Sequence, residues 1–216
     1  VWTIIGSNIL GFIIAYFLNE KLYRRGAIRT LFFIPNVIST VLISFIWVFI
    51  YSQVMPAIGK AITWEWLANA SWFGTRRMAM ITIITVSIWQ NIGFLMLIYT
   101  AGLQTISKDI IEASEMDGCT GLNKIFKIQI PLLMPSITIN LFVSIASSFK
   151  AYDIENALTG GGPSGSTQPM SMNIYQEAFV KYNLGYGSAK SVILFIIVAI
   201  ITCIQLYLTS RKEVEA

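Results

Sequence analysis

The sequence predicts an all-α fold, a polytopic bundle of transmembrane helices that forms one domain over residues 1–216. Of the 216 residues, 55% are hydrophobic and only 12% are charged, whereas soluble domains carry roughly 25% charged residues. The apolar residues also gather in blocks of ~20 residues, which is the length that a helix needs to cross the hydrocarbon of a membrane. Five stretches fit this length: 1–18, 31–51, 79–103, 131–150 and 188–208. Because the chain opens directly on an apolar run without a Met, we expect one further N-terminal span before it.

Residue types exclude several functional classes. The chain has no histidine, and Cys119 and Cys203 lie in separate segments, one polar and one apolar. Metal catalysis and a disulfide framework are therefore not expected. No G-x-x-x-x-G-K-[ST] phosphate loop occurs, so the chain cannot hydrolyse ATP alone and carries no cofactor.

The basic residues predict the orientation of the bundle, since Lys and Arg concentrate in cytoplasmic loops. Nine of them fall on one side: Lys21, Arg24, Arg25, Arg29, Lys108, Lys124, Lys127, Arg211 and Lys212. The other side has four, which are Lys60, Arg76, Arg77 and Lys181. The side with nine is predicted to be cytoplasmic. The net charge of +4 then reflects topology and contact with anionic membrane lipid, not a nucleic-acid partner.

Polar residues end the first predicted span, and a proline interrupts the second. Span one stops at Asn19 and Glu20, and span two contains Pro35 one turn from its cytoplasmic start, where a proline kinks or loosens a helix. Residues 52–78 are then predicted to form an extracytoplasmic connection. Its tryptophans, Trp64, Trp66 and Trp72, are of the kind that anchors at headgroup depth.

The later spans frame a second extracytoplasmic segment. Span three has an interior polar group at Trp89, Gln90, Asn91 and Gly93. After span four, residues 152–187 are predicted to lie outside the membrane. They contain the turn TGGGPSGST, which cannot be helical, and the stretch MNIYQEAFVKY, whose apolar spacing suits a helix on the membrane surface.

The cytoplasmic segment 106–131 is the most structured connection in the sequence. Asp109 is predicted to cap a helix that Gly118 ends, because glycine accepts a left-handed backbone. A second short amphipathic helix follows, with Leu122, Ile125 and Phe126 on one face. Pro131 is predicted to open span four. Two helices joined by a glycine corner are suited to dock into a groove on a partner.

This segment carries a family resemblance. It reads Glu112-Ala113-Ser114, three residues, Gly118, nine residues, then Ile128-Gln129-Ile130-Pro131. The spacing resembles the EAA signature of the integral-membrane subunits of bacterial binding-protein-dependent ABC importers. With LFFIPNVIS and ALTGGGP elsewhere, the chain is similar over its whole length to the carbohydrate permeases of maltose, lactose and glycerol-phosphate type. Such permeases usually begin with one more helix.

The resemblance implies a type I importer permease that forms half of a sugar translocation pathway. Its partners would be a second homologous permease, two ATPase subunits that hold ATP and Mg, and an extracytoplasmic solute-binding protein, at a bacterial inner or plasma membrane. The coupling to the ATPase would fall on Glu112, Ala113, Ser114, Asp117, Gly118 and Pro131. The competing interpretation is that the acidic residues are merely solvated charges.

The resemblance also places a sugar pathway on spans three and four, where polar side chains are tolerated in a bilayer. The matching positions are Trp89, Gln90, Asn91, Phe94, Ser144, Ser148 and Ala151. Packing contacts between helices are the alternative role for small and hydroxyl residues. The match does not fix the sugar. Lys150, near Asp153 and Glu155, could attract an acidic ligand, or could pair with Asp153 or reach the interface.

Two more expectations complete the sequence-based interpretation. By resemblance, the turn formed by Gly160, Gly161, Gly162 and Pro163 faces the extracytoplasmic binding protein, although as bare chemistry it is a flexible turn. The alternative function is a secondary transporter or channel subunit. Proton or sodium coupling usually needs buried acids in the spans, and nearly all acids here lie in predicted loops.

Overall fold

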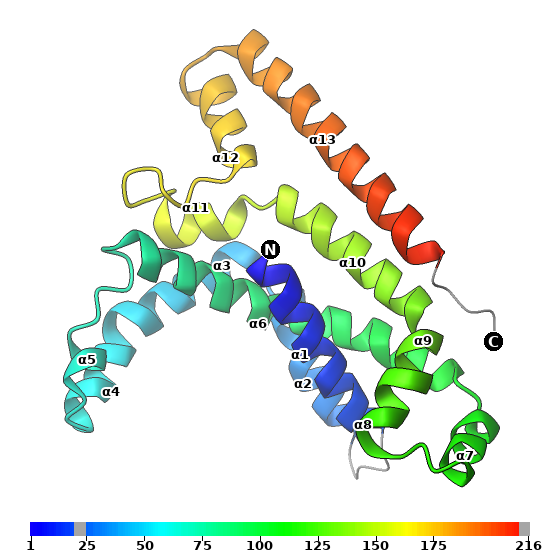
Figure 1. Cartoon of the computed structure of the whole chain (residues 1–216). Helices are drawn as coiled ribbons and strands as arrows, with labels where there is room; N and C mark the ends of the chain where they lie inside the picture. Colours follow the sequence, from blue (N-terminus) through cyan, green and yellow to red (C-terminus); the bar gives the residue numbers. More distant parts are fainter. Residues whose placement is uncertain (20–24, 212–216) are drawn as a thin grey trace.

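The computed structural model describes residues 1–19 and 25–211, and every regular element within them is helical (Figure 1). The first half contains α1 (Trp2–Asn19), α2 (Arg25–Val37), α3 (Thr40–Phe49), α4 (Met55–Ala61), α5 (Glu65–Ala68) and α6 (Arg76–Thr105). The second contains α7 (Lys108–Met116), α8 (Gly121–Lys124), α9 (Ile130–Leu132), α10 (Met134–Phe149), α11 (Asp153–Thr159), α12 (Met170–Tyr175) and α13 (Leu184–Ser210). Three π-helical turns, Ile50–Val54, Ile125–Gln129 and Gln176–Val180, join neighbouring helices.

Four helical stretches are long and apolar enough to cross a membrane: Trp2–Asn19, Thr40–Ala61, Arg76–Thr105 and Leu184–Ser210. A fifth span arises if Gly121–Leu132 and Met134–Phe149, which meet at 73°, are counted as one. The all-α polytopic fold predicted from the sequence is confirmed. Four of the five predicted spans agree with observed helices to within about four residues, which is the usual uncertainty of helix ends in sequence-based prediction.

The predicted second span, 31–51, was wrong in its placement. The chain forms α2 up to Val37, breaks at Ile38 and Ser39, and then continues as one apolar helical stretch over Thr40–Ala61. Pro35 lies two residues before the end of α2. It lacks the N–H that a helix interior uses, so the interruption falls close behind it. The connection predicted at 52–78 is consequently helical in its first third.

The start of span four lies three residues after the predicted Pro131. Pro131 lies in the short helix α9, and the span itself begins at Met134, with the 73° bend between them. Leu133 at the bend is only 1% exposed and packs in a core cluster with Met96, Tyr99 and Leu103 of α6. Burial of Leu133 therefore fixes where the bend falls, and the proline only helps to start the turn before it.

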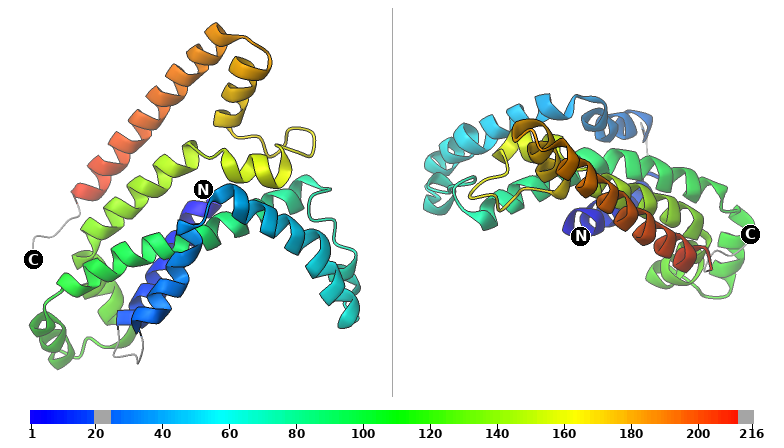
Figure 2. Two further views of the ribbon diagram at one scale, coloured as in Figure 1. Left: turned by 180° about the vertical axis from the view of Figure 1, so that it is seen from behind. Right: turned by 90° about the horizontal axis from the view of Figure 1, so that it is seen from above.

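Helix α6 is the central element of the bundle. Helices α1, α2, α10 and α11 all pack against it, whereas α13 packs on α10, α12 and the third π-helical turn (Figures 1 and 2). Within the most apolar 18 residues of each helix, 44% of the α6 segment is buried inside the protein, compared with 6% of the α13 segment. The exposed apolar surface of α13 suits a lipid environment, because lipid is as apolar as its side chains.

Close approaches of the backbone fix two of these contacts. A Cβ on Gly93 of α6 would lie 2.1 Å from the Phe32 carbonyl oxygen of α2, and one on Gly102 would lie 2.1 Å from Ser136 Oγ of α10. Only glycine permits such proximity. These glycines bring α2 and α10 onto α6 and thereby close the space described below.

Candidate functional site

Helix α7 is capped by local hydrogen bonds at both ends. The residue that caps it is Ser107, whose Oγ accepts from the Asp109 backbone N–H at 3.2 Å, so the prediction of Asp109 as the cap was wrong. Gly118 ends the helix with φ of +77°. The Gly118 N–H donates to the Glu115 carbonyl at 3.0 Å, and the Cys119 N–H donates to the Ser114 carbonyl at 2.8 Å. This pattern is a Schellman motif.

The predicted coupling residues divide into an outward and an inward set. Glu112, Ala113, Asp117 and Gly118 are exposed. Ser114 is buried and donates to the Ile111 carbonyl at 2.7 Å, and Pro131 is half-buried. Ser114 and Pro131 therefore support the segment, and the other four residues form its surface.

Apolar side chains extend this surface. Met116 is 88% exposed, Leu122 is 71% exposed and Phe126 is 64% exposed. Glu115 and Lys124 form an ion pair at 2.7 Å that ties α7 to α8. The segment lies at the end of the bundle where α1 ends and α2 begins (Figure 1). Of the basic linker there, Lys21 and Arg24 fall outside the described residues, as does Lys212 of the tail.

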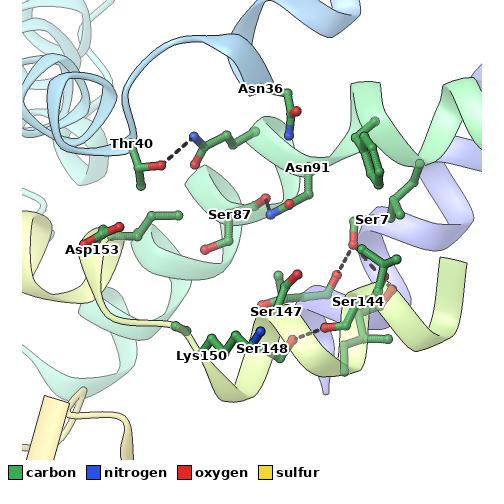
Figure 3. A pocket seen from close by; sticks show the side chains of 18 of the residues that line it. Ser7, Asn36, Thr40, Ser87, Asn91, Ser144, Ser147, Ser148, Lys150 and Asp153 are labelled. Carbon is green, nitrogen blue, oxygen red and sulfur yellow. Dashed lines mark hydrogen bonds between the residues drawn. The ribbon is translucent and has the colours of Figure 1, made fainter. Parts of the chain in front are cut away.

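A cavity of about 510 Å³ lies between the N-terminal turns of α1, the α2–α3 break, the middle of α6 and the end of α10 (Figure 3). Hydroxyl and amide groups dominate its polar lining. The residues that contribute them are Thr3, Ser7, Asn36, Thr40, Ser87, Gln90, Asn91, Ser144, Ser147, Ser148 and Tyr152. Phe94 supplies an aromatic surface, and Lys150, Asp153 and Glu155 supply the ionisable groups.

Six of the seven predicted pathway residues line this cavity, namely Gln90, Asn91, Phe94, Ser144, Ser148 and Ala151. Trp89 does not line it. Its ring packs edge-on against Trp47 with centroids 5.4 Å apart, within an aromatic group at the α3 side of the bundle. The α6 residues that line the cavity, Ser87, Gln90, Asn91, Phe94 and Leu95, share one face of the helix, and at about 100° per residue Trp89 falls outside that face.

Sequence reasoning missed the cavity residues that come from outside spans three and four. Ser7 lies on α1, while Asn36 and Thr40 flank the α2–α3 break. The IPN segment around Pro35 was a usable signal, because a proline inside an apolar stretch frees backbone and neighbouring polar groups only where they line protein or water.

The ionisable groups sit at the α10–α11 connection. Lys150 forms no ion pair with a described carboxylate. The pairing with Asp153, one of the alternatives raised by the sequence, is therefore not formed. Glu155 is half-buried, and its buried Oε2 has no hydrogen-bond partner. Burial, together with the charge of Asp153, raises the pKa of Glu155, so its neutral form is favoured.

The glycine turn after α11 is ordered by hydrogen bonds. Gly160 and Gly161 have φ of +59° and +84°, and Thr167 Oγ1 donates to the Gly162 carbonyl at 2.6 Å. Gly160 is exposed, Gly161 is buried, and Gly162 and Pro163 are half-buried. The turn therefore offers a defined surface mainly through Gly160 and the exposed Ser164 and Gly165 that follow.

Across residues 1–19 and 25–211, no three His, Cys, Asp or Glu side chains lie together as metal ligands would. The two focal features are instead an exposed helical corner and a polar cavity, both attached to α6 and α10.

Comparison with known proteins identifies the family of this chain. The family model described as "Binding-protein-dependent transport system inner membrane component" matches residues 7–214. The chain is 38% identical over 208 residues to "Probable starch degradation products transport system permease protein AmyD" of Thermoanaerobacterium thermosulfurigenes, covering 96% of this chain and 70% of that protein. It is 35% identical over 211 residues to the multiple sugar-binding transport system permease protein MsmF of Streptococcus mutans, covering 98% and 72%.

A solved structure shows the same fold. The structure is a bacterial ABC transporter involved in the import of the acidic polysaccharide alginate, and one of its chains superposes with a TM-score of 0.82 at 19% identity, over 97% of this chain and 77% of that chain. The fold, the signature in the α7–α9 segment and the match over residues 7–214 agree. The chain belongs to the family of inner membrane components of binding-protein-dependent transport systems, and is a multi-pass permease subunit.

Proposed function

We propose that this permease subunit forms half of the passage of an ATP-driven oligosaccharide importer in a bacterial inner or plasma membrane. ATP and Mg bind to two separate ATPase subunits, and a second homologous permease completes the passage. A solute-binding protein delivers the sugar from outside. The exposed surface of α7, around Glu112 and Ala113, contacts the ATPase, and the glycine turn at Gly160 contacts the binding protein.

The observation that carries this proposal is the connection between the two focal features. Helices α6 and α10 both line the cavity, and the segment with the exposed corner joins the end of α6 directly to the start of α10. A displacement of α7 by a bound partner therefore acts on both cavity walls at once. Such mechanical continuity is what an importer needs if its ATPase is a separate polypeptide.

The cavity chemistry supports a sugar as the substrate. Hydroxyl and amide side chains both donate and accept hydrogen bonds, as sugar hydroxyls do, and Phe94 offers an apolar face. The names of AmyD and MsmF point to starch products and multiple sugars. We propose starch-derived malto-oligosaccharides as the substrate class.

The test is co-purification of the tagged full-length permease with the ATPase subunit encoded by the same organism. Glu112→Lys is expected to abolish recovery of the ATPase, because it reverses an exposed charge at the proposed contact. Glu65→Lys, which alters an exposed glutamate of α5, is the matched control and is expected to leave recovery unchanged. Equal ATPase recovery with Glu112→Lys and wild type contradicts the proposed contact, and uptake by liposomes holding the permease alone contradicts the importer itself.

A further inference from the structure

Segment 170–180, which consists of α12 and the third π-helical turn, packs against the first turns of α13 (Figures 1 and 2). A Cβ on Gly187 of α13 would lie 2.6 Å from the Cβ of Ala178 in this segment, so the two backbones approach as closely as a glycine allows. The Asn183 backbone N–H also donates to the Glu177 carbonyl at 2.9 Å. The segment therefore runs back along α13 after a tight corner.

Lys190 of α13 binds the segment through two residues that share one face of it. Lys190 Nζ donates to Asn173 Oδ1 at 2.7 Å and lies 3.6 Å from Glu177 Oε1. The Nζ also lies 4.4 Å from the centroid of the Tyr186 ring, which adds a cation–π attraction. The side chains of Lys190 and Glu177 are only 20% and 12% exposed. Because water has little access to this pair, it is screened less than a surface ion pair.

Lys190 lies at one boundary of the hydrocarbon that α13 crosses. Arg211 follows it by 21 residues, which is about 31 Å of helix and close to the ~30 Å thickness of a hydrocarbon core. Arg211 lies over the Tyr207 ring, 4.3 Å from the centroid, as Lys190 lies over Tyr186. Basic and aromatic side chains gather at membrane boundaries. Segment 170–180 is therefore joined to α13 at the membrane surface.

The other contacts of the segment reach the connection between α10 and α11. Ser171 Oγ donates to the Ala151 carbonyl, and the Tyr175 ring packs against Tyr152 with centroids 5.2 Å apart. Ala151 and Tyr152 both line the cavity, at the end of α10 remote from the α7–α9 segment. No described residue of α13 lines the cavity. The segment thus joins α13 to a cavity wall that α13 itself does not form.

We propose that Lys190 is a positioning residue of the importer. Through segment 170–180 it holds the α10–α11 connection in place at the extracytoplasmic end of the cavity, which restricts access from outside until α13 is displaced. The proposal rests on the proposed function and deepens it. Because only 6% of the most apolar part of α13 is buried, this helix can shift in lipid with little loss of packing. A short segment fixed at both ends transmits that shift to the cavity.

Lys181 provides an internal comparison for Lys190. Its Nζ lies 2.9 Å from Glu177 Oε1, the same oxygen that Lys190 approaches, but Lys181 follows Glu177 by four residues in the same stretch of chain. Its side chain is also 59% exposed. Loss of Lys181 therefore leaves the segment joined to α13, whereas loss of Lys190 removes the polar contacts between them.

The experiment uses the intact importer in proteoliposomes, with full-length permease, second permease, ATPase subunits and binding protein, and with Cys119 and Cys203 replaced by Ser. Ser147→Cys, at an exposed position of the cavity lining, reports access. The readout is the rate at which a membrane-impermeant methanethiosulfonate on the extracytoplasmic side modifies this cysteine without ATP. Lys190→Met keeps an apolar stem and removes the charge. It is expected to raise the rate about fivefold, the change in an equilibrium that corresponds to about 1 kcal/mol.

Matched variants separate positioning from general loosening. Lys190→Arg, which keeps the charge and the donors, and Lys181→Met are each expected to leave the rate near that of wild type. Ser171→Ala removes the donor to Ala151 at the other end of the segment and is expected to raise the rate severalfold. Ser191→Ala, whose hydroxyl bonds only within α13, is its control and is expected to have no effect.

Transport provides a readout that a merely structural role would not move. In Lys190→Met and Ser171→Ala, sugar taken up per ATP hydrolysed is expected to fall, because sugar can leave the cavity outward before the ATPase cycle is complete. Unfolding temperatures are expected to stay within about 4 °C of wild type, since one contact is lost in each variant.

The inference and the proposed function fail in different ways. Equal modification rates in Lys190→Met and Lys181→Met, in an importer that transports, overturn the inference and leave the function intact. If Lys190→Met does not assemble, a wild-type rate in Ser171→Ala overturns the inference instead. A wild-type assembly without ATP-dependent uptake of radiolabelled malto-oligosaccharides overturns the proposed function, while the modification rates of the variants still test the contact between segment 170–180 and α13.

Discussion

The α7–α9 segment and the cavity are built in opposite ways although the same two helices connect them. In the segment, the chain satisfies itself locally: Ser107 caps α7, Gly118 ends it, and the Glu115–Lys124 pair spans nine positions. At the cavity, some of the bonds also join residues far apart in sequence, such as Gln90 to Thr40 across 50 positions and Asn8 to Ser144 across 136 positions. The segment exposes its polar and apolar side chains on the surface, whereas the polar side chains of the cavity face its interior.

This difference separates folding from assembly. Substitutions in the cavity walls remove long-range contacts that hold α1, α2 and α10 on α6, so we expect them to change the stability of the bundle. Substitutions on the exposed surface of α7 remove no internal contact, so we expect them to change only binding to a partner. Substitutions in the two regions test this separation.

The largest effect is expected at Gly93. Gly93→Ala places a Cβ 2.1 Å from the Phe32 carbonyl oxygen, so α2 must move away from α6. Overpacking of this kind costs about 3 kcal/mol, which is measured as thermal unfolding of the detergent-solubilised chain. Gly185→Ala, where nothing lies within 4 Å, is the control. Equal unfolding temperatures for the two variants would mean that α2 does not pack on α6 as described.

Gly118→Val tests the corner of the coupling segment. A β-branched residue at φ of +77° carries a strain of about 1–2 kcal/mol, which α7 relieves by fraying at its end. Co-purification with the ATPase is expected to fall severalfold, and the unfolding temperature of the bundle to stay unchanged. Gly118→Asn, which tolerates this conformation, should keep most of the binding. A large drop in bundle stability with Gly118→Val would remove the distinction between the two regions.

Tyr99→Phe tests the buried network behind the cavity. It removes the donor to Asn8 Oδ1 and leaves that oxygen buried without its partner. The expected loss is about 1 kcal/mol of stability, since interhelical hydrogen bonds in membranes contribute about 0.6 to 1.7 kcal/mol. Tyr207→Phe on the exposed face of α13 is expected to cost nothing. A destabilisation no larger than that of Tyr207→Phe would show that α1 is held by apolar packing alone.

The smallest effect concerns pH. Burial raises the pKa of Glu155, so the folded chain keeps this proton at pH values where the unfolded chain has lost it. Stability therefore falls as pH rises from the unfolded carboxyl pKa through the folded one. Glu155→Gln removes this loss, and its stabilising effect should be greater at pH 8 than at pH 4.5. A pH-independent Glu155→Gln effect contradicts the account.

Different parts of the molecule were predictable to different degrees. The spans and the Gly118 corner follow from local composition and backbone preference, which a sequence displays directly. A kink at Pro35 was predicted, but the end of α2 two residues later was not, and neither were the bend at Leu133 and the cap at Ser107. The bend depends on the burial of Leu133 against α6, and the cap on a choice between two nearby capping residues that local pattern does not decide.

The residues that line the cavity were also only partly predictable from the sequence. Family resemblance located Gln90, Asn91, Ser144 and Ser148 on its walls, because these positions lie on two identifiable spans. It did not locate Asn36, which lies just before the α2–α3 break, or Ser147, which lies beside Ser148 on α10. Trp89 was placed on the pathway but packs against Trp47, because it lies outside the face of α6 that lines the cavity.

The most direct test of the account is site-specific crosslinking in the intact importer, with Cys119 and Cys203 replaced by Ser. Ala113→Cys, on the exposed face of α7, is predicted to crosslink to the ATPase, and Ser164→Cys, in the exposed glycine turn, to crosslink to the solute-binding protein. Crosslinking of Ala113→Cys to the binding protein, or of Ser164→Cys to the ATPase, would contradict the assignment of the two ends of the bundle.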